Sequence, residues 1–371
     1  MAGGTRVYVA GDNQTRLWYI SSRERVRRMV KALGWELVDR AEDARVLVND
    51  AFAFDMAWLK HVAALPDRAL TLGGVPVIAC VSTSELATAV AAQMQAMGTS
   101  LPPAVGALPA ESGTSIMNEA LRKREVPFVL PLTPATVGQA ERASYVGAYK
   151  GVTDLLTKYL WPEWAFHLTR LAARIGLSPN MVTTIGAIFC VIATLAFVRG
   201  DYWLGLATGL FFMVLDTVDG KLARCTITSS WWGNIFDHGM DLIHPPIWWW
   251  AWAVGLAAYG TPLSSEAIWW SLGVIVVGYV VQRLIEGAFI KSFGMHIHVW
   301  ERLDSQFRLI TARRNPNMVI LFASLLVGRP DWGLLALAWW TGLSCLFHLV
   351  RLFQAYARRG GGRPIISWLA D

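Results

Sequence analysis

Four aspartates stand at spacings that would bring their carboxylates together. Asp216 and Asp219 are three residues apart, and Asp237 and Asp241 are four residues apart. On a helix, either spacing places both side chains of a pair on one face. Four carboxylates at close range repel one another and stay ionised only beside cations, and oxygen ligands suit Mg²⁺ or Mn²⁺. The pattern therefore predicts a divalent-metal site that would act on the oxygens of a pyrophosphate.

The helices that must carry these pairs are apolar. The 371-residue chain is 54% hydrophobic and 16% charged, and beyond about Arg174 it consists largely of apolar runs long enough to cross a bilayer. Carboxylates inside such runs are costly and usually functional. We predict an α-helical integral membrane protein with six transmembrane helices, at residues 180–198, 203–222, 234–257, 267–289, 316–327 and 334–353.

Tryptophans and basic residues indicate where the chain leaves the bilayer. The sequence has 19 tryptophans, several of them clustered as at Trp248–Trp250, and such side chains settle at the membrane boundary. Lys and Arg gather before the first span, in the loops after the second and fourth spans, and after the last, whereas the opposite loops carry little more than Arg199 and Arg329. We therefore expect a multi-pass protein of the cell inner (cytoplasmic) membrane, with both termini cytoplasmic.

Before the membrane part, the apolar residues follow a different pattern. Short apolar runs alternate with amphipathic stretches up to about Leu132, which predicts a small α/β cytoplasmic domain with a mainly parallel sheet over residues 1–150. Residues 151–176 are amphipathic and basic, as in a helix lying in the membrane interface; a soluble linker helix is the alternative. The membrane domain then covers residues 177–358, and residues 359–371 form a cytoplasmic tail.

Two broader features narrow the function. The net charge of +6 is small and scattered, so we expect no nucleic-acid partner; it suits anionic lipid headgroups or phosphorylated substrates. The four cysteines are far apart and are expected to be free thiols.

The residues around the aspartates match one fixed pattern, D-x2-D-G-x2-A-R-x8-G-x3-D-x3-D. Its eight positions are all met, by Asp216, Asp219, Gly220, Ala223, Arg224, Gly233, Asp237 and Asp241. The chain thereby resembles the CDP-alcohol phosphotransferase family, most strongly here and more loosely over residues 178–358. The resemblance implies transfer of a substituted phosphate group from a CDP-alcohol to a polar alcohol in phospholipid biosynthesis, with release of CMP. It also implies two divalent ions, Mg²⁺ or Mn²⁺, and a homodimer.

The resemblance assigns a role to each matching position. Asp216, Asp219, Asp237 and Asp241 would bind the metals, and Asp241 would also take the proton from the acceptor hydroxyl. The cytidine nucleotide would contact a set of small, polar and basic residues, namely Asn180, Thr183, Asp216, Gly220, Ala223, Arg224 and Gly233. Plain helix packing is the alternative role of the glycines and the alanine, and a helix-end charge that of Arg224.

Basic residues near the membrane could bind the acceptor's phosphate. Arg283, Arg313 and Arg314 stand where relatives bind that group, although positive-inside anchoring explains Arg313 and Arg314 nearly as well. His238 and His244 lie close to the second aspartate pair and are expected to be packed or hydrogen-bonded residues, because four carboxylates are available as ligands.

The N-terminal domain is similar to a degenerate cytidylyltransferase, a domain that some members of the family carry as a fusion. Gly11 ends the first strand, and Asp50 and Asp55 follow a later one, as in the nucleotide loop and metal strand of that fold. However, Asp12-Asn13-Gln14 stands where glycines would approach a triphosphate. We expect a non-catalytic domain used for stability, oligomer contacts or regulation; the alternative is a bifunctional enzyme that makes its own CDP-alcohol.

Other substrates and other classes of protein stay open at this point. CDP-diacylglycerol is the favoured donor because most relatives use it, and the fusion favours CDP-inositol with an inositol phosphate as an alternative pair. Intramembrane Mg²⁺-dependent prenyltransferases also carry aspartate-rich pairs, but without the glycines and the Ala-Arg at these spacings. The non-enzymatic alternatives are an inactive membrane scaffold and a cation carrier.

Overall fold

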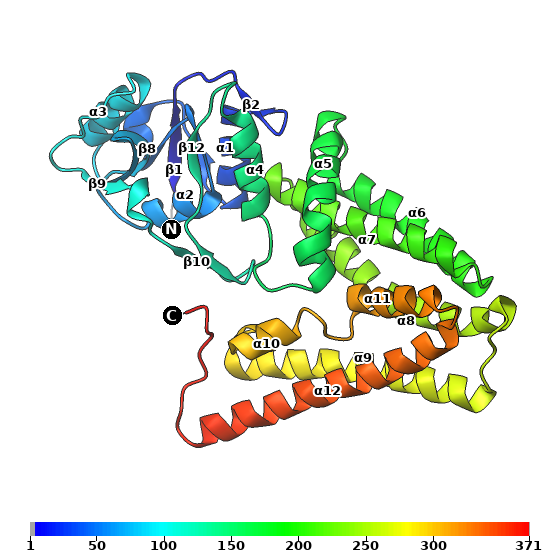
Figure 1. Cartoon of the computed structure of the whole chain (residues 1–371). Helices are drawn as coiled ribbons and strands as arrows, with labels where there is room; N and C mark the ends of the chain where they lie inside the picture. The colour runs from blue at the N-terminus through cyan, green and yellow to red at the C-terminus, as the bar shows by residue number, and fades with distance from the viewer. Residues whose placement is uncertain (1–3, 371) are drawn as a thin grey trace. The chain divides into compact units, whose positions relative to one another are not determined.

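The computed structural model describes residues 4–370, except for the side chains of Asn234, Asp237 and His238. The chain forms two compact units (Figure 1). The first consists of the residues up to Tyr149 together with Arg170–Gly176 and Lys221–Ser229. The second consists of Lys150–Thr169, Leu177–Gly220 and the residues from Ser230 onward. The first unit thus contains a loop from the helical part of the sequence as well as the N-terminal domain.

The N-terminal domain is built on a six-stranded mixed sheet. Three of its five neighbouring strand pairs are parallel, and the two pairs that include β8 are antiparallel. The prediction of an α/β domain is therefore confirmed. The strands, in their order across the sheet, are β4 (Glu36–Leu37), β1 (Arg6–Ala10), β5 (Val46–Asn49), β8 (Val75–Cys80), β7 (Arg68–Leu72) and β9 (Gly106–Pro109).

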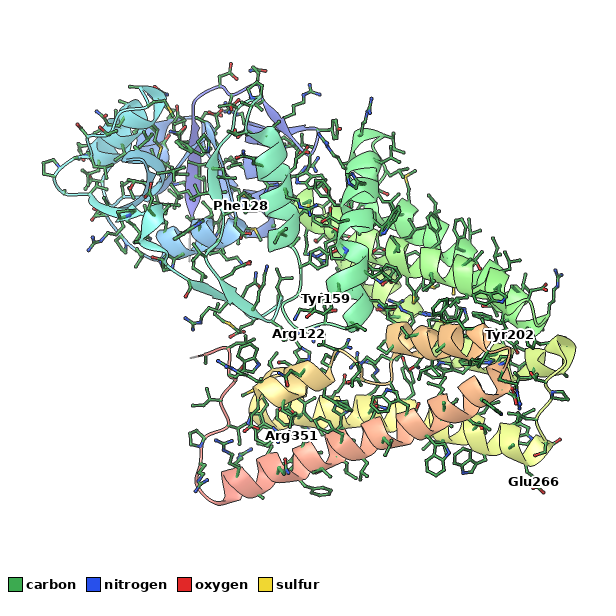
Figure 2. The ribbon with its side chains drawn as sticks, in the orientation of Figure 1. Arg122, Phe128, Tyr159, Tyr202, Glu266 and Arg351 are labelled. Carbon is green, nitrogen blue, oxygen red and sulfur yellow. The ribbon has the colours of Figure 1, made fainter. Side chains whose placement is uncertain are left out.

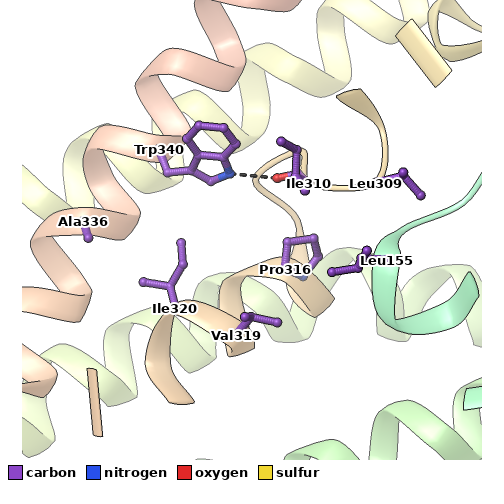
Figure 3. Close-up of a pocket in the computed structure, with 8 residues that line it drawn as sticks. All are labelled: Leu155, Leu309, Ile310, Pro316, Val319, Ile320, Ala336 and Trp340. Carbon is purple, nitrogen blue, oxygen red and sulfur yellow. Dashed lines mark hydrogen bonds between the residues drawn. The ribbon is translucent and has the colours of Figure 1, made fainter. Parts of the chain in front are cut away.

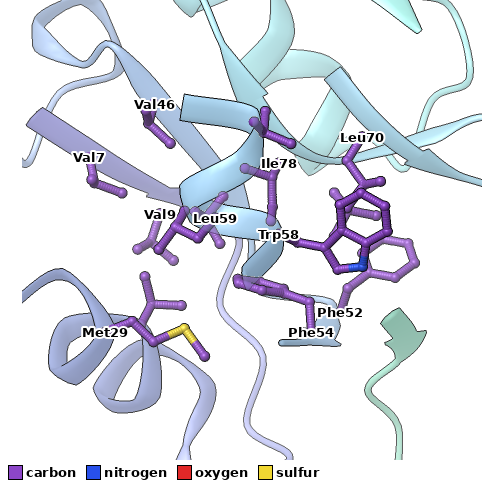
Figure 4. Packing of buried hydrophobic residues seen from close by; sticks show 14 of the residues in the cluster. Val7, Val9, Met29, Val46, Phe52, Phe54, Trp58, Leu59, Leu70 and Ile78 are labelled. Carbon is purple, nitrogen blue, oxygen red and sulfur yellow. The ribbon is translucent and has the colours of Figure 1, made fainter. Parts of the chain in front are cut away.

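Alternation along the strands gives this sheet two apolar faces. Val7 and Val9 of β1 join one buried cluster with α1 (Ser22–Ala32) and α2 (Met56–Ala63) (Figure 4). Ala10 joins a second cluster with α3 (Ser84–Gln95). Successive side chains of a strand point to opposite faces, so helices can cover both. The result is a three-layer arrangement.

Smaller elements complete the domain. Three two-stranded pairs lie outside the main sheet, and α4 (Val137–Gly147) follows the last of these strands. The pairs are β2 (Arg16–Leu17) with β3 (Ile20–Ser21), β10 (Ile116–Asn118) with β11 (Lys123–Glu125), and β12 (Val129–Pro131) with β6 (Phe52–Phe54).

Long helices occupy the predicted membrane segments. They are α6 (Pro179–Val198), α7 (Tyr202–Cys225), α8 (Trp231–Tyr259), α9 (Ser265–Phe293), α11 (Arg314–Leu326) and α12 (Pro330–Gly360). Within the described residues, α6, α7, α9 and α12 are long and apolar enough to cross a membrane. At 1.5 Å per residue, the 13 residues of α11 span only about 20 Å, less than a hydrocarbon core of about 30 Å. The prediction of an apolar helical membrane part is confirmed, but the count of six spans is not.

Small residues let these helices approach closely. A Cβ built on Gly255 of α8 would lie 1.9 Å from the carbonyl oxygen of Phe197 in α6. Nearby, the Tyr202 hydroxyl of α7 donates to the carbonyl of Trp252 at 2.5 Å (Figure 2). Close backbone approach through small residues is typical of membrane helix packing, and here it joins α6, α7 and α8.

The remaining helices pack around α12. It lies along both α9 and α11. Its Arg351, labelled in Figure 2, donates to Asp304 and Glu301 at 2.7 Å each, which attaches the short helix α10 (Arg302–Phe307). The side chains of Arg351 and Asp304 are almost fully buried. This buried charge network holds the connection between α9 and α11 against the end of α12.

The segment predicted to lie in the interface is helical. A π-helical turn, η3 (Leu156–Leu160), continues into α5 (Trp161–Arg174), and Pro162 is the second residue of α5. Tyr159, Trp164 and Leu171 are exposed apolar side chains on this segment. They would suit an interfacial helix.

Candidate functional site

The aspartate pairs lie on two helices, as their spacing predicts. Asp216 and Asp219 are one turn apart on α7. Asp237 and Asp241 lie on α8. The side chain of Asp237 lies outside the described residues, whereas those of Asp216, Asp219 and Asp241 are described.

Arg314 brings two of the carboxylates together. It is the first residue of α11, and its guanidinium donates to Asp216 Oδ2 and to Asp241 Oδ1, both at 2.6 Å. The helices α7 and α8 and the start of α11 therefore meet at one charged centre. Sequence reasoning placed Arg314 with the acceptor's phosphate, whereas in the structure it contacts the proposed metal ligands directly.

Asp219 is held from the first membrane helix. Its side chain is buried, and its Oδ2 accepts a hydrogen bond from Thr183 Oγ1 at 2.6 Å. Thr183 lies one turn into α6, which begins after the N-cap Ser178. The predicted nucleotide-binding residue Thr183 is thus in direct contact with a predicted metal ligand.

The starts of α6 and α8 are also in contact. A Cβ on Gly233 would lie 2.8 Å from Asn180 Oδ1, so only glycine fits there without a shift. Gly233 therefore provides close approach to α6, a neighbour that its sequence did not reveal. Gly220, Ala223 and Arg224 continue along α7; the last two belong to the first unit and are half-buried.

Arg283 and Arg313 converge on a residue that sequence reasoning missed. Arg283 Nη1 lies 3.4 Å from Glu286 Oε2, and the Arg313 guanidinium donates to Glu286 Oε1. His298 Nε2 lies 3.3 Å from the same Oε1, and burial holds the pKa of His298 well below its ordinary value. The signal in the sequence was a carboxylate within an apolar run, three residues after Arg283.

A second missed group surrounds Asp154. Its Oδ1 accepts from Asn315 Nδ2 and from the Thr157 backbone N–H, both at 3.0 Å. Burial opposes ionisation, yet the charge of Arg308 and these hydrogen bonds hold the pKa of Asp154 below its ordinary value. Asn315 follows Arg314 directly, so this anchor fixes the start of α11 that carries the bridging arginine.

The histidines behave as expected where they are described. His244 is buried, contacts the Met240 carbonyl through Nδ1 at 2.6 Å, and packs against Phe212 and Trp248. It is a packed histidine, as predicted, while the His238 side chain lies outside the described residues. The prediction that the four cysteines are free thiols is confirmed.

An apolar cavity of about 380 Å³ lies on another face of α11 (Figure 3). Pro316, two residues after Arg314, lines it, and the Trp340 indole donates to the Ile310 carbonyl at 2.8 Å. All the lining side chains are apolar: Leu155, Leu309, Ile310, Pro316, Val319, Ile320, Ala336 and Trp340. Such a cavity can accept a hydrocarbon group.

The donor set fits a hard cation. Among the described side chains, no three metal-binding groups converge within reach of one ion. A guanidinium cation lies between Asp216 and Asp241, so this place stabilises positive charge. Carboxylate oxygens are the ligands that Mg²⁺ and Mn²⁺ prefer.

The part of the chain that carries these residues is similar to known proteins. Residues 177–348, which include all eight positions of the pattern, match the family described as CDP-alcohol phosphatidyltransferase. Cholinephosphotransferase 1 of Gallus gallus is 35% identical over 130 residues, which are 32% of this chain and 37% of that protein. The phosphatidylinositol phosphate synthase of Streptomyces avermitilis is 31% identical over 109 residues, which are 29% of this chain and 40% of that protein.

A solved structure is also similar. The phosphatidylinositol phosphate synthase of Mycobacterium tuberculosis, in complex with manganese and citrate, aligns with a TM-score of 0.40 and 20% identity, over 51% of this chain and 88% of that one. The chain spans less than half the length of the two curated relatives described above.

Proposed function

We propose, from the match of residues 177–348 to the CDP-alcohol phosphatidyltransferase family, that the chain transfers a substituted phosphate group from a CDP-alcohol to the hydroxyl of a polar alcohol. CMP is released, and the product belongs to phospholipid biosynthesis. The observation that carries the proposal is the complete pattern on α7 and α8, with Asp216 and Asp241 drawn together at Arg314. The match to this family supports a transferase over a prenyltransferase, a cation carrier or a scaffold.

The four aspartates would hold the metal. Asp216, Asp219, Asp237 and Asp241 are the ligands we propose, with two Mg²⁺ or Mn²⁺ ions as the cofactor. When bound, such ions supply positive charge that polarises the diphosphate of the donor and stabilises the leaving CMP. Arg314 would then leave its pairing with the carboxylates or share it, and its guanidinium is suited to phosphate oxygens.

Asp241 would act as the base. Its side chain is 47% exposed, more than those of Asp216 and Arg314, so an acceptor can reach it. The hydroxyl proton passes to the Asp241 carboxylate while the hydroxyl oxygen bonds to the donor's β-phosphorus. The bond from that phosphorus to the bridging oxygen breaks, and CMP departs with its electron pair.

The nucleotide and the acceptor would bind on either side of this centre. Asn180, Thr183, Gly220, Ala223, Arg224 and Gly233, with Asp216, are the residues we propose for the cytidine nucleotide. For a phosphate on the acceptor we propose Arg283, Arg313 and Arg314. Glu286 neutralises part of the charge of Arg283 and Arg313, so an acceptor phosphate would have to compete with this carboxylate.

We favour CDP-diacylglycerol as the donor. The apolar cavity beside the start of α11 would suit a substrate with a hydrocarbon part. It therefore supports CDP-diacylglycerol more than the alternative, CDP-inositol with an inositol phosphate. The names of the relatives refer to different polar groups, choline and inositol phosphate, so the acceptor is a question for experiment.

The membrane arrangement is part of the proposal. Six spans, with α8 and α11 added to the four long apolar helices, would place both termini in the cytoplasm of a cell whose inner membrane holds the protein. The amphipathic segment of η3 and α5 would lie in the interface, and two copies would form a homodimer.

The N-terminal domain would be a nucleotidyltransferase relic without activity. The backbone N–H of Asn13 donates to Asp50 Oδ2 at 2.8 Å, so it is directed at a carboxylate where a working loop would bind phosphate. A Cβ on Gly11 would lie 2.1 Å from Asp50 Oδ1, which shows how closely this carboxylate approaches the loop. Asp55 serves as the N-cap of α2. These roles support a structural use of both aspartates.

The test is CMP release from the detergent-purified chain with Mn²⁺ or Mg²⁺. CDP-diacylglycerol and CDP-inositol would each be offered with a panel of polar alcohols, with and without phosphate. We expect metal-dependent release with one pair and a loss of at least about 100-fold in Asp241→Asn. Asp331→Asn is the matched control, because Asp331 pairs with Arg329 at the start of α12. Absence of release with every donor would refute the proposal.

A further inference from the structure

We propose that the N-terminal domain positions the metal ligands by holding the loop that joins the two halves of the pattern. The loop follows Cys225, the last residue of α7, and leads to Trp231, the first of α8. Arg25 and Arg28 on α1 are the positioning residues. The effect of this loop on catalysis rests on the proposed function, but the inference that the domain holds the loop does not.

Two arginines bind the end of α7. Arg25 is 6% exposed, and its Nη1 donates to the Cys225 carbonyl at 2.7 Å. Arg28 Nη1 donates to the next carbonyl, that of Thr226, at 2.8 Å. The last carbonyls of a helix have no partner within it and favour positive charge. Arginines some 200 residues earlier in the chain therefore serve as the C-terminal cap of the helix that carries Asp216 and Asp219.

Other carbonyls at the end of α7 accept hydrogen bonds from backbone N–H groups just beyond the helix, and the arginines add donors for the carbonyls that follow. The Thr226 N–H donates to the Leu222 carbonyl at 2.9 Å, and the Thr228 N–H donates to the Ala223 carbonyl at 2.8 Å. The Cys225 carbonyl is the acceptor that Arg25 takes. Without α1, this carbonyl would need water or a rearranged turn.

The loop conformation is one that its own sequence disfavours. Ile227 has φ +53°, in the left-handed region, where a β-branched residue is strained. Its side chain packs against the core cluster between α1, α2 and the sheet. Partial burial of Ile227 in the N-terminal domain thus offsets the backbone strain, which indicates that this loop geometry depends on the domain.

A third contact lies inside the pattern itself. Lys221, adjacent to Gly220, is buried, and its Nζ lies over the ring of Tyr149, 2.8 Å from the centroid, and 5.5 Å from that of Tyr145. A cation over aromatic faces is stabilised most strongly when it is removed from water. The N-terminal domain therefore contacts the end of α7 through carbonyls, a loop side chain and a lysine.

These contacts matter because the loop connects the two sets of ligands. Asp216 and Asp219 precede it on α7, and Asp237 and Asp241 follow it on α8. Displacements of about 1 Å in a reacting centre can cost on the order of 100-fold in rate. A domain that has lost its own chemistry would thus be retained because it keeps the two aspartate pairs in register.

The experiment uses the full chain and compares neighbouring arginines on α1. Arg25→Ala and Arg28→Ala remove the bonds to the loop. Arg27→Ala is the matched control: Arg27 and Arg28 both pair with Glu24 at 2.7 Å, and it is Arg28 that donates to the Thr226 carbonyl of the loop. Arg25→Lys and Arg28→Lys keep the charge and test rescue.

Three quantities are measured: amide hydrogen exchange of residues 222–229, Mn²⁺ binding by electron paramagnetic resonance, and kcat and KM for CMP release. We expect exchange on the order of 10- to 100-fold faster in Arg25→Ala and Arg28→Ala, with weaker Mn²⁺ binding and lower kcat but an unchanged donor KM. Arg27→Ala should match the unsubstituted chain, and the lysine variants should recover part of each loss.

The possible outcomes separate this inference from the proposed function. Unchanged exchange in Arg25→Ala and Arg28→Ala would overturn the holding of the loop. Faster exchange with unchanged Mn²⁺ binding would overturn the positioning of the ligands. If the unsubstituted chain releases no CMP from any donor, the proposed function fails, while exchange and Mn²⁺ binding still decide this inference.

Discussion

Replacing Arg314 by methionine should destabilise the metal-free protein, and metal should restore much of the loss. Arg314 is the first residue of α11, and it bridges Asp216 on α7 and Asp241 on α8. Methionine keeps the apolar stem of the side chain but leaves two carboxylates without this cation. Removing one partner of a buried ion pair is costly because the other charge stays buried.

The size of the effect follows from the exposure of the side chains. Arg314 and Asp216 are 14% and 15% exposed, so their bond should contribute about 1.5–3 kcal/mol. Asp241 is 47% exposed, and its bond is closer to a surface pair, about 0–1 kcal/mol. Arg314→Met should therefore lower the free energy of unfolding by about 1.5–4 kcal/mol in the absence of metal.

Metal should act differently on the two proteins. A ligand present at about 100 times its dissociation constant stabilises the folded state by about 2.7 kcal/mol. In the unsubstituted chain, the metal would displace Arg314 from the carboxylates, so part of the stabilisation by metal only offsets the loss of the Arg314 bonds. Arg314→Met has no such bonds to lose. Mn²⁺ should thus raise the unfolding temperature of Arg314→Met more than that of the unsubstituted chain.

The assay is thermal unfolding of detergent-purified protein, followed by tryptophan fluorescence in EDTA and in Mn²⁺. Arg313→Met is the matched control: its guanidinium binds Glu286, so it should lose stability without a larger response to Mn²⁺. Equal unfolding temperatures of Arg314→Met and the unsubstituted chain in EDTA would refute the bridging role. Equal Mn²⁺ responses would refute a shared site for arginine and metal.

Three further predictions concern single contacts. Thr183→Val removes the 2.6 Å bond to Asp219 and should weaken Mn²⁺ binding about tenfold or more, measured by titration; unchanged affinity would exclude Asp219 as an oriented ligand. Gly255→Ala should destabilise the helices by about 1–3 kcal/mol, because its Cβ would meet the Phe197 carbonyl at 1.9 Å; an unfolding temperature equal to that of the unsubstituted chain would contradict this packing. Burial lowers the pKa of His298, so only the unfolded state gains this proton below about pH 6.5. Stability should therefore fall as pH drops from about 7.5 to 5.5, less steeply in His298→Gln; parallel curves would argue against a buried neutral histidine.

Much of the fold could be predicted from local patterns. Apolar runs at membrane length predicted helices α6, α7, α8, α9, α11 and α12 with each end within about four residues, except that α12 continues to Gly360 where residue 353 was predicted. Alternating short runs predicted the N-terminal sheet. The number of membrane spans was harder to predict, because α11 is short and α8 carries polar residues in its first half. The three- and four-residue spacings of the aspartates predicted which helix carries each pair, since helix geometry is local.

Side-chain partners across the chain could not be predicted in the same way. The sequence placed Arg283, Arg313 and Arg314 together as one basic group, but the structure divides them: Arg314 binds Asp216 and Asp241, and the other two bind Glu286. In the sequence, three arginines close to one membrane boundary look the same whichever carboxylate each of them faces in the structure. Helix packing decides which one each of them reaches.

By itself, the sequence determined the features on which the proposed chemistry rests: carboxylates at helical spacing, small residues between them, and apolar runs of membrane length. These features follow from residue type and from the period of a single helix. The tertiary structure alone decided that a guanidinium joins the two aspartate helices, and that Arg25 caps a helix ending 200 residues later. Such contacts depend on which surfaces pack together, and no local period in the sequence carries that information.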